Sequence, residues 1–155
     1  MKVRLLTVSN RQPGWVVDAC AEYRKRLPRA WRFEIVEVKP EARGAGSEAA
    51  RVRAAEARRL RAAIPKGALV VALDERGAQD STERFAERLA AWQQRGRDLV
   101  FAIGGADGFD PEFLAGAELR LALSRMTMPH GMVRVVFVEQ LYRAFTLLEG
   151  HPYHK

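Results

Sequence analysis

Two short, uninterrupted apolar runs constrain the fold of this chain more than any other feature. Residues 68–73 (ALVVAL) and 99–103 (LVFAI) contain no polar side chain over their whole length. Strands that are buried on both faces have this pattern, whereas strands with one face in water alternate polar and apolar residues. A segment with the apolar spacing of a helix separates the two runs, so the sequence predicts a parallel sheet with helices on both faces.

The other expected elements alternate along the sequence in the same way. The segment Asp80-Ser81-Thr82-Glu83 has an oxygen-bearing cap with a Glu three residues on, and Asp110 also offers a side-chain oxygen that can cap the start of a helix. Further strands are expected at residues 2–8, 31–38 and 119–123, helices between residues 13 and 28 and at 47–64, 80–96, 110–115 and 132–148, and a loop around Gly44 and Gly46. The 155 residues are therefore expected to form a single α/β domain, a three-layer sandwich around a mainly parallel sheet of about five strands.

The last expected helix, at residues 132–148, is unusual because it is apolar almost all round. Val133, Val135, Val136 and Val138 leave it without a clear polar face. A helix of this kind must be covered, either by the rest of the domain or by a partner subunit.

Positive charge is concentrated in the first part of the sequence. The net charge is +7 overall, but residues 1–66 carry 16 basic and 7 acidic side chains, whereas residues 67–155 carry 10 and 12. A net charge of +9 on the first part favours a polyanionic partner, with nucleic acid as the leading class. The alternative is that these arginines reflect codon usage and form an ordinary solvated surface.

Cysteine and histidine usage argues against disulfides and metal. Cys20 is the one cysteine, and the three histidines, His130, His151 and His154, do not have the spacing of a metal motif. The sequence also contains no signal peptide and no uncharged run long enough to span a bilayer. We therefore expect a cytoplasmic protein with no metal and no membrane partner.

Three segments that follow predicted strands are candidates for a ligand site, because ligands of open α/β sheets bind beyond the carboxyl ends of the strands. These segments are residues 74–77, 104–108 and 124–131. The glycines of the second segment fit either a tight structural turn or a loop that approaches a ligand. The third segment has the character of a lid or floor, and its His130 is expected to be a structural group. Neither of the two common nucleotide-binding glycine motifs is present.

The C-terminal segment, residues 150–155 (GHPYHK), combines an aromatic ring, two histidines and a lysine. This mixture can stack on a base and contact phosphate. The alternative is a frayed polar end.

Several motifs, taken in order, carry a family resemblance. They are FAIGGADG at 101–108, LSRMTMPH at 123–130, VRV at 133–135, EQLYRAF at 139–145 and PYHK at 152–155. Together they resemble the RlmH family of SPOUT-class methyltransferases, which act on large-subunit ribosomal RNA. The resemblance covers the whole sequence. It implies a C-terminal trefoil knot, a homodimer with the terminal helix at its interface, and transfer of a methyl group from S-adenosylmethionine to N3 of a pseudouridine in 23S rRNA.

The resemblance also implies two sets of site residues. The cofactor would be bound by Leu73, Gly104, Gly105, Leu123, Ser124, Arg125, Met126, Thr127 and Met128. The catalytic residues would be Arg143, Tyr153 and His154, in a tail that reaches toward the cofactor of the partner subunit. His154 would accept the N3 proton, Arg143 would stabilise the anion or contact phosphate, and Tyr153 would position or stack on the base.

Two other functions compete with this hypothesis. A non-enzymatic RNA-binding or ribosome-assembly protein could use the same basic part and aromatic tail, but it would have no affinity for S-adenosylmethionine. A SPOUT enzyme acting on tRNA would share the cofactor site, although the Pro-Tyr-His tail argues against it. A nucleotide-dependent enzyme has the least support, because its phosphate motifs are missing.

Overall fold

The computed structural model describes residues 1–44 and 48–154, so Gly46, Ser47 and Lys155 lie outside the described residues. Five strands form one sheet in the order β2-β1-β4-β3-β5. β1 pairs in parallel with β2 and β4, and β3 pairs in parallel with β4 and β5. The strands are β1 (Val3–Val8), β2 (Glu34–Val38), β3 (Leu69–Gln79), β4 (Leu99–Ile103) and β5 (Leu119–Ala122). The predicted parallel sheet is confirmed.

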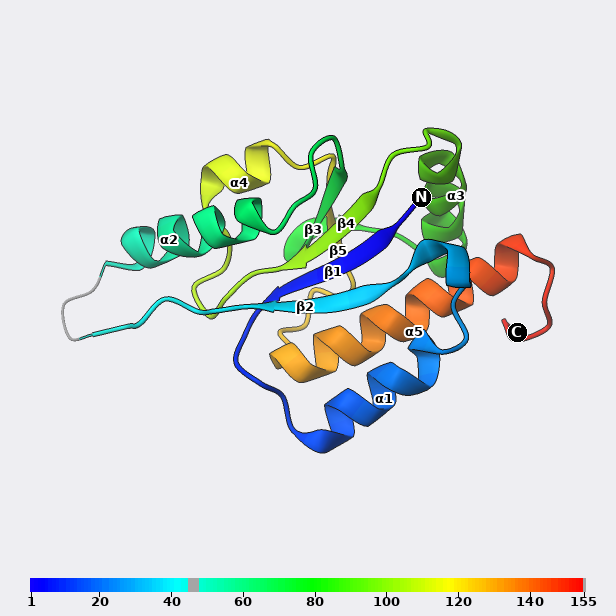
Figure 1. Cartoon of the computed structure of the whole chain (residues 1–155), viewed down its shortest axis with the longest axis horizontal. Coiled ribbons are helices and arrows are strands. Elements are labelled where there is room, and N and C mark those ends of the chain that lie inside the picture. The colour runs from blue at the N-terminus through cyan, green and yellow to red at the C-terminus, as the bar shows by residue number, and fades with distance from the viewer. Residues whose placement is uncertain (45–47, 155) are drawn as a thin grey trace.

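Helices cover both faces of this sheet (Figure 1). They are α1 (Gly14–Arg24), α2 (Ala49–Ala62), α3 (Thr82–Gln94), α4 (Pro111–Ala115) and α5 (His130–Leu148), with a short 3₁₀ helix, η1 (Arg29–Trp31), before β2. Buried side chains of α1, α3 and α5 form the core on one face, and those of α2 and α4 form the core on the other. The protein is therefore the three-layer α/β sandwich that the sequence predicts, while the trefoil knot stays a prediction.

The helix starts follow from the expected caps. The Ser81 hydroxyl accepts a hydrogen bond from the Arg84 backbone N–H at 3.1 Å, and the Asp110 carboxylate accepts from Glu112 and Phe113 at 3.1 and 3.3 Å. Each cap satisfies N–H groups that the first turn of a helix leaves without a partner. Both predicted helix starts are confirmed, and the cap of the first is Ser81.

The apolar terminal helix α5 is covered largely by its own domain. It packs between α1 and α3, and Phe137, Val138 and Leu141 are fully buried. At its start, however, Met132 is exposed, as are Trp15 and Val17 on the neighbouring α1. None of the helices in the described residues is both long and apolar enough to cross a membrane.

β3 corrects the prediction of a loop at residues 74–77. Leu73 and Ala78 both pair with Leu121 of β5, so the four residues between them bulge out of the ladder and the strand then resumes up to Gln79. Gly77 permits this return, because a Cβ atom there would lie 2.5 Å from the Arg120 carbonyl oxygen. The segment is thus a bulge within a strand and not a loop after it.

β2 is shorter than the predicted strand at residues 31–38. Trp31 belongs to η1, and Arg32 has left-handed backbone angles, with φ 45° and ψ 44°. A strand cannot continue through such a residue, so β2 begins at Glu34. Trp31 is buried edge-on against Phe145 of α5, with ring centroids 5.5 Å apart.

Candidate functional site

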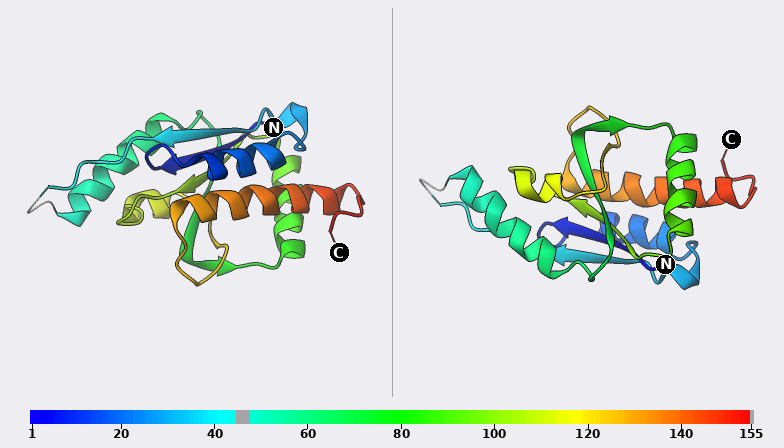
Figure 2. Two further views of the ribbon diagram at one scale, coloured as in Figure 1. Left: turned by 90° about the horizontal axis from the view of Figure 1, so that it is seen from below. Right: turned by 90° about the horizontal axis from the view of Figure 1, so that it is seen from above.

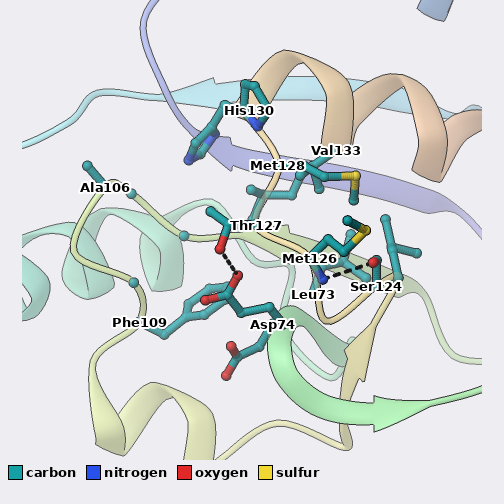
Figure 3. Close-up of a pocket in the computed structure, with 17 residues that line it drawn as sticks. Leu73, Asp74, Ala106, Phe109, Ser124, Met126, Thr127, Met128, His130 and Val133 are labelled. Carbon is teal, nitrogen blue, oxygen red and sulfur yellow. Dashed lines mark hydrogen bonds between the residues drawn. The ribbon is translucent and has the colours of Figure 1, made fainter.

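A pocket of about 330 Å³ lies at the carboxyl ends of β4 and β5 and beside the bulge of β3 (Figure 3). It is lined by residues of all three segments that the sequence predicts as ligand candidates, together with the start of α5. The lining residues are Leu73, Asp74, Glu75, Ile103, Gly104, Gly105, Ala106, Gly108, Phe109, Leu123, Ser124, Met126, Thr127, Met128, Pro129, His130 and Val133. Eight of the nine residues expected to bind a cofactor are in this set. The ninth, Arg125, is exposed and does not line the pocket.

The glycine segment is both a tight turn and a pocket wall. Gly108 has a φ of +80°, and its N–H donates a hydrogen bond to the Gly105 carbonyl oxygen at 2.9 Å. A Cβ atom on Gly104 would lie 3.1 Å from the Gly108 backbone, and one on Gly105 would lie 2.5 Å from Glu56 Oε1. The two interpretations left open by the sequence are therefore compatible, because the turn brings bare backbone to the pocket.

Glu56 of α2 supports this turn from the side away from the pocket. Its side chain is 4% exposed, and its Oε2 accepts a hydrogen bond from the Glu41 backbone N–H at 3.1 Å. Its Oε1 is buried and has no hydrogen-bond partner within residues 1–44 and 48–154. Burial raises the pKa of Glu56, with the Glu41 N–H acting in the opposite direction and the nearby Asp107 adding to the rise.

The raised pKa of Glu56 predicts a pH-dependent contribution to stability. Because the folded state binds the proton more tightly than the unfolded state, the contribution of Glu56 is present below its unfolded pKa of about 4.3 and is lost as pH rises through its folded pKa. Relative to Glu56→Gln, the wild-type protein should therefore gain stability as pH falls from 7 toward 4.5. Urea unfolding midpoints of both proteins across this range test it, and parallel profiles would contradict it.

Two hydrogen bonds shape the third wall of the pocket, residues 123–129. The Ser124 hydroxyl accepts a hydrogen bond from the Met126 backbone N–H at 2.9 Å, and the Thr127 hydroxyl donates to Glu75 Oε2 at 3.0 Å (Figure 3). The second bond ties this segment to the bulge of β3 across the pocket mouth. Met126 is 78% exposed, whereas Met128 is half-buried and lines the pocket.

His130 lies on the pocket wall at the first turn of α5. Burial lowers its pKa, Arg134 lowers it further, and a hydrogen bond with the Gly104 backbone opposes both effects. Its Nδ1 is buried and has no hydrogen-bond partner in the part of the chain that the structure describes. The ring is therefore a neutral group with one unused polar atom beside the pocket.

This depressed pKa predicts that acid weakens the fold through His130. The folded state disfavours the imidazolium, so the stabilising contribution of His130 is present above its unfolded pKa of about 6.5 and is lost as pH falls through its folded value. The wild-type protein should therefore lose stability below about pH 6.5 relative to His130→Gln, which cannot be protonated. Thermal unfolding of both proteins between pH 5 and 8 measures this, and identical pH dependence would refute it.

The expected catalytic residues Arg143 and Tyr153 meet at the other end of α5. The Arg143 guanidinium contacts Glu139 Oε1 at 2.7 and 2.8 Å and lies 4.9 Å from the centre of the Tyr153 ring. The Tyr153 hydroxyl donates a hydrogen bond to the same Glu139 oxygen at 3.2 Å. Burial, Tyr23 and Glu139 together raise the pKa of Tyr153 to about 12, so its hydroxyl stays protonated at neutral pH.

The tail that carries Tyr153 folds back on α5. Gly150, with a φ of +68°, reverses the backbone direction, and the His151 N–H donates to the Thr146 carbonyl oxygen at 2.9 Å. His154 is half-buried, with its Nε2 3.2 Å from Glu83 Oε1 of α3 and its Nδ1 buried without a partner. Residues 150–154 are thus ordered by specific contacts and are not a frayed end.

The pocket and the tail residues are far apart within one subunit. His130 begins α5 and Arg143 follows 13 residues later, which places them about 20 Å apart along the helix axis at 1.5 Å per residue. The C-terminus accordingly lies at the far end of α5 (Figure 2). The structure brings together the expected cofactor residues and, separately, Arg143 and Tyr153, but it does not join the two groups.

Comparison with known proteins identifies the family. Residues 1–154 match the family model described as "Predicted SPOUT methyltransferase". The chain belongs to the SPOUT methyltransferase family. Relatives from Burkholderia vietnamiensis (strain G4 / LMG 22486) and Burkholderia multivorans (strain ATCC 17616 / 249) are each 52% identical to this SPOUT protein over 155 residues. The match covers 100% of this sequence and 99% of each relative, and both relatives are named "Ribosomal RNA large subunit methyltransferase H".

Sequence reasoning missed several residues of this SPOUT site. Glu139 could have been found, because a Glu four residues before an Arg on one helix face commonly pairs with it. Glu56 and Glu83 gave no local signal, because they meet Gly105 and His154 only through the tertiary fold. Among residues 1–44 and 48–154, no group of three or more His, Cys, Asp or Glu side chains could hold a metal ion.

Proposed function

We propose that this protein transfers the methyl group of S-adenosylmethionine to N3 of a pseudouridine in the 23S rRNA of the large ribosomal subunit. The observation that carries the proposal is the pocket at the bulge of β3 and the ends of β4 and β5, which gathers eight of the nine residues expected to bind the cofactor. The pocket would bind the cofactor, and the separate Arg143–Tyr153 pair would bind the RNA base that accepts the methyl group. The full-length similarity to relatives named for large-subunit rRNA methylation supports the substrate.

The residues of the pocket fit the proposed cofactor. Apolar Leu73 and Val133 would flank the adenine, and the bare backbone at Gly104 would allow it to approach closely. Asp74 and Glu75 offer negative charge to a molecule with a sulfonium and an ammonium group. When bound, S-adenosylmethionine supplies an already activated methyl group, so the protein must mainly align the acceptor and remove its proton.

The tail residues would handle the acceptor base. Tyr153 stays protonated, so it would position or stack on the base and would not remove the proton. Arg143, held by Glu139, would stabilise the anion that forms when N3 loses its proton. His154, whose buried Nδ1 has no partner among the described residues, would accept that proton.

The separation of the two groups supports a homodimer. A tail about 20 Å along α5 from its own pocket needs a second copy to bring it to a cofactor. The exposed apolar side chains of Trp15, Val17 and Met132 near the start of α5 are suited to an interface. The proposed active centre would then combine the pocket of one subunit with the tail of the other.

In a cytoplasmic enzyme, the two parts of the sequence would have different roles. Residues 1–66, with a net charge of +9, would contain the surface that docks on the ribosome, and residues 67–155 would bind the cofactor and carry out the transfer.

Incubation with large ribosomal subunits and methyl-labelled S-adenosylmethionine tests the activity. Label in 23S rRNA is the expected result, and label in tRNA alone, in a parallel incubation with tRNA, would favour the tRNA enzyme. Calorimetry that detected no S-adenosylmethionine binding would favour the non-enzymatic RNA-binding protein.

A further inference from the structure

A groove of about 430 Å³ lies between the end of α1 and η1 and is lined by four cationic side chains, Arg24, Lys25, Arg29 and Arg32. We call it the basic groove. We propose that it binds the phosphate backbone of ribosomal RNA next to the active centre. This inference deepens the proposed function and rests on it for the identity of the RNA.

The cations of the basic groove are largely without counter-charges. Lys25 pairs with Glu22 at 2.8 Å, but within the described residues no ion pair or hydrogen bond engages the side chain of Arg24, Arg29 or Arg32. Other arginines of the protein have carboxylate partners, such as Arg88 with Asp80 at 2.5 Å. Like charges gathered at one place without compensation repel one another, and an anionic ligand relieves that repulsion.

The backbone at Arg32 is a second, independent observation. Its left-handed conformation is disfavoured for residues other than glycine and asparagine, and it is the only such residue other than glycine among residues 1–44 and 48–154. Among the described residues the Arg32 guanidinium has no partner, so no contact of its side chain there offsets the cost of the backbone conformation. Unfavourable backbone conformations that persist commonly mark functional sites. An external anion would account for the residue.

The 3₁₀ helix η1, which borders the basic groove, packs against the end of α5 that carries the Arg143–Tyr153 pair. Trp31 of η1 packs on Phe145, two residues beyond Arg143 on α5. Figures 1 and 2 both place η1 and the end of α1 at the same end of the molecule as the C-terminus. A nucleic acid strand that presents a base to Tyr153 would therefore run its backbone past the basic groove.

Aromatic contacts extend this connection. The Arg26 guanidinium lies 5.5 Å from the centre of the Tyr23 ring and 5.7 Å from the centre of the Tyr142 ring. The Tyr142 ring in turn packs on the Tyr153 ring, with ring centroids 4.7 Å apart. The four cations of the groove are themselves exposed. Exposed cations spread along a groove suit an extended polyanion better than a single phosphate ion, which is usually held in a cradle of backbone N–H groups.

Salt-dependent binding to purified large subunits tests the proposal. The test variant is Arg29→Gln with Arg32→Gln, and the matched control is Arg53→Gln with Arg58→Gln on α2, which removes the same charge from the opposite face of the sheet. We expect the test variant to bind about 10- to 100-fold more weakly at 0.1 M KCl, with the slope of log affinity against log salt reduced by about 2. The control should change affinity less than about threefold.

A single substitution separates charge from folding. Arg32→Gly removes the charge and also relieves the left-handed backbone, so it should unfold at a higher temperature than the wild type and still bind the subunit more weakly. Arg32→Lys should retain most of the binding. Unchanged affinity in Arg32→Gly, or an equal loss in the α2 control, would overturn the assignment of the groove.

The outcomes also separate this inference from the proposed function. If the wild type binds subunits through the basic groove but transfers no methyl group, the proposed methyltransferase activity is refuted and RNA binding by the groove is retained. If a groove variant binds subunits with normal affinity and transfers methyl groups, RNA binding by the groove is refuted and the proposed methyltransferase activity is retained. Groove-dependent binding to phosphatidylglycerol vesicles but not to subunits would assign the groove to a lipid surface and overturn its assignment to RNA.

Discussion

Replacement of Arg143 by alanine is expected to slow methyl transfer about 100- to 1000-fold at saturating RNA and cofactor, the usual effect of removing one group that stabilises developing charge. Affinity for S-adenosylmethionine should change less than about threefold, because Arg143 does not line the cofactor pocket and is proposed to act on the acceptor base. Single-turnover rates and calorimetry on the same preparation measure the two quantities.

Two further variants make this result specific to the charge of Arg143. Arg143→Lys keeps a cation but loses the planar contact with Glu139, so it should recover part of the rate. Leu148→Ala, at an exposed position near the end of the same helix, should keep the wild-type rate. A parallel loss of cofactor affinity and rate in Arg143→Ala would mean that the residue supports the fold and not the reaction.

The same separation predicts that two inactive variants restore activity when their subunits are mixed. Thr127→Trp places an indole in the pocket at an exposed position, and Arg143→Ala disables the tail. If each active centre combines the pocket of one subunit with the tail of the other, a mixed dimer has one intact centre. Random exchange makes half of the dimers mixed, so the mixture should reach about a quarter of the wild-type activity.

Matched mixtures control this experiment. Each variant is also mixed with the wild type. These two mixtures show whether subunits exchange and whether a variant subunit inactivates the wild-type subunit in the same dimer. Size-exclusion chromatography must first find a dimer. A mixture of the two variants that stays as inactive as either alone, although subunits exchange, would place the tail and the pocket of the active centre in one subunit.

The α/β architecture could be predicted because buried parallel strands appear in the sequence as uninterrupted apolar runs. The apolar runs at residues 68–73 and 99–103 became β3 and β4 in the sheet. The continuation of β3 to Gln79 left no such record, because residues 74–77 are polar and the strand resumes only through its pairing with β5. The left-handed turn at Arg32 was equally invisible, since arginine gives no local signal for that conformation.

The candidate site could be predicted in part for the same reason. Two of its walls are segments that follow strands and the third is the bulge of β3, and the topology of a parallel sheet brings such segments to one edge. The support from Glu56 and the unused nitrogen of His130 depend on contacts between residues distant in the sequence, so no spacing rule reveals them. The sequence also placed the pocket and the tail in one site, and the structure adds the length of α5 that separates them within a subunit.

Mass mapping of modified nucleosides tests the central claim most directly. Large ribosomal subunits that lack the modification are incubated with the protein and S-adenosylmethionine, and the 23S rRNA is digested to nucleosides and to mapped fragments. We predict one new 3-methylpseudouridine at a single position of 23S rRNA, formed by the wild type and not by Arg143→Ala. A methyl group on another nucleoside, or none in 23S rRNA although the protein binds S-adenosylmethionine, would contradict the account.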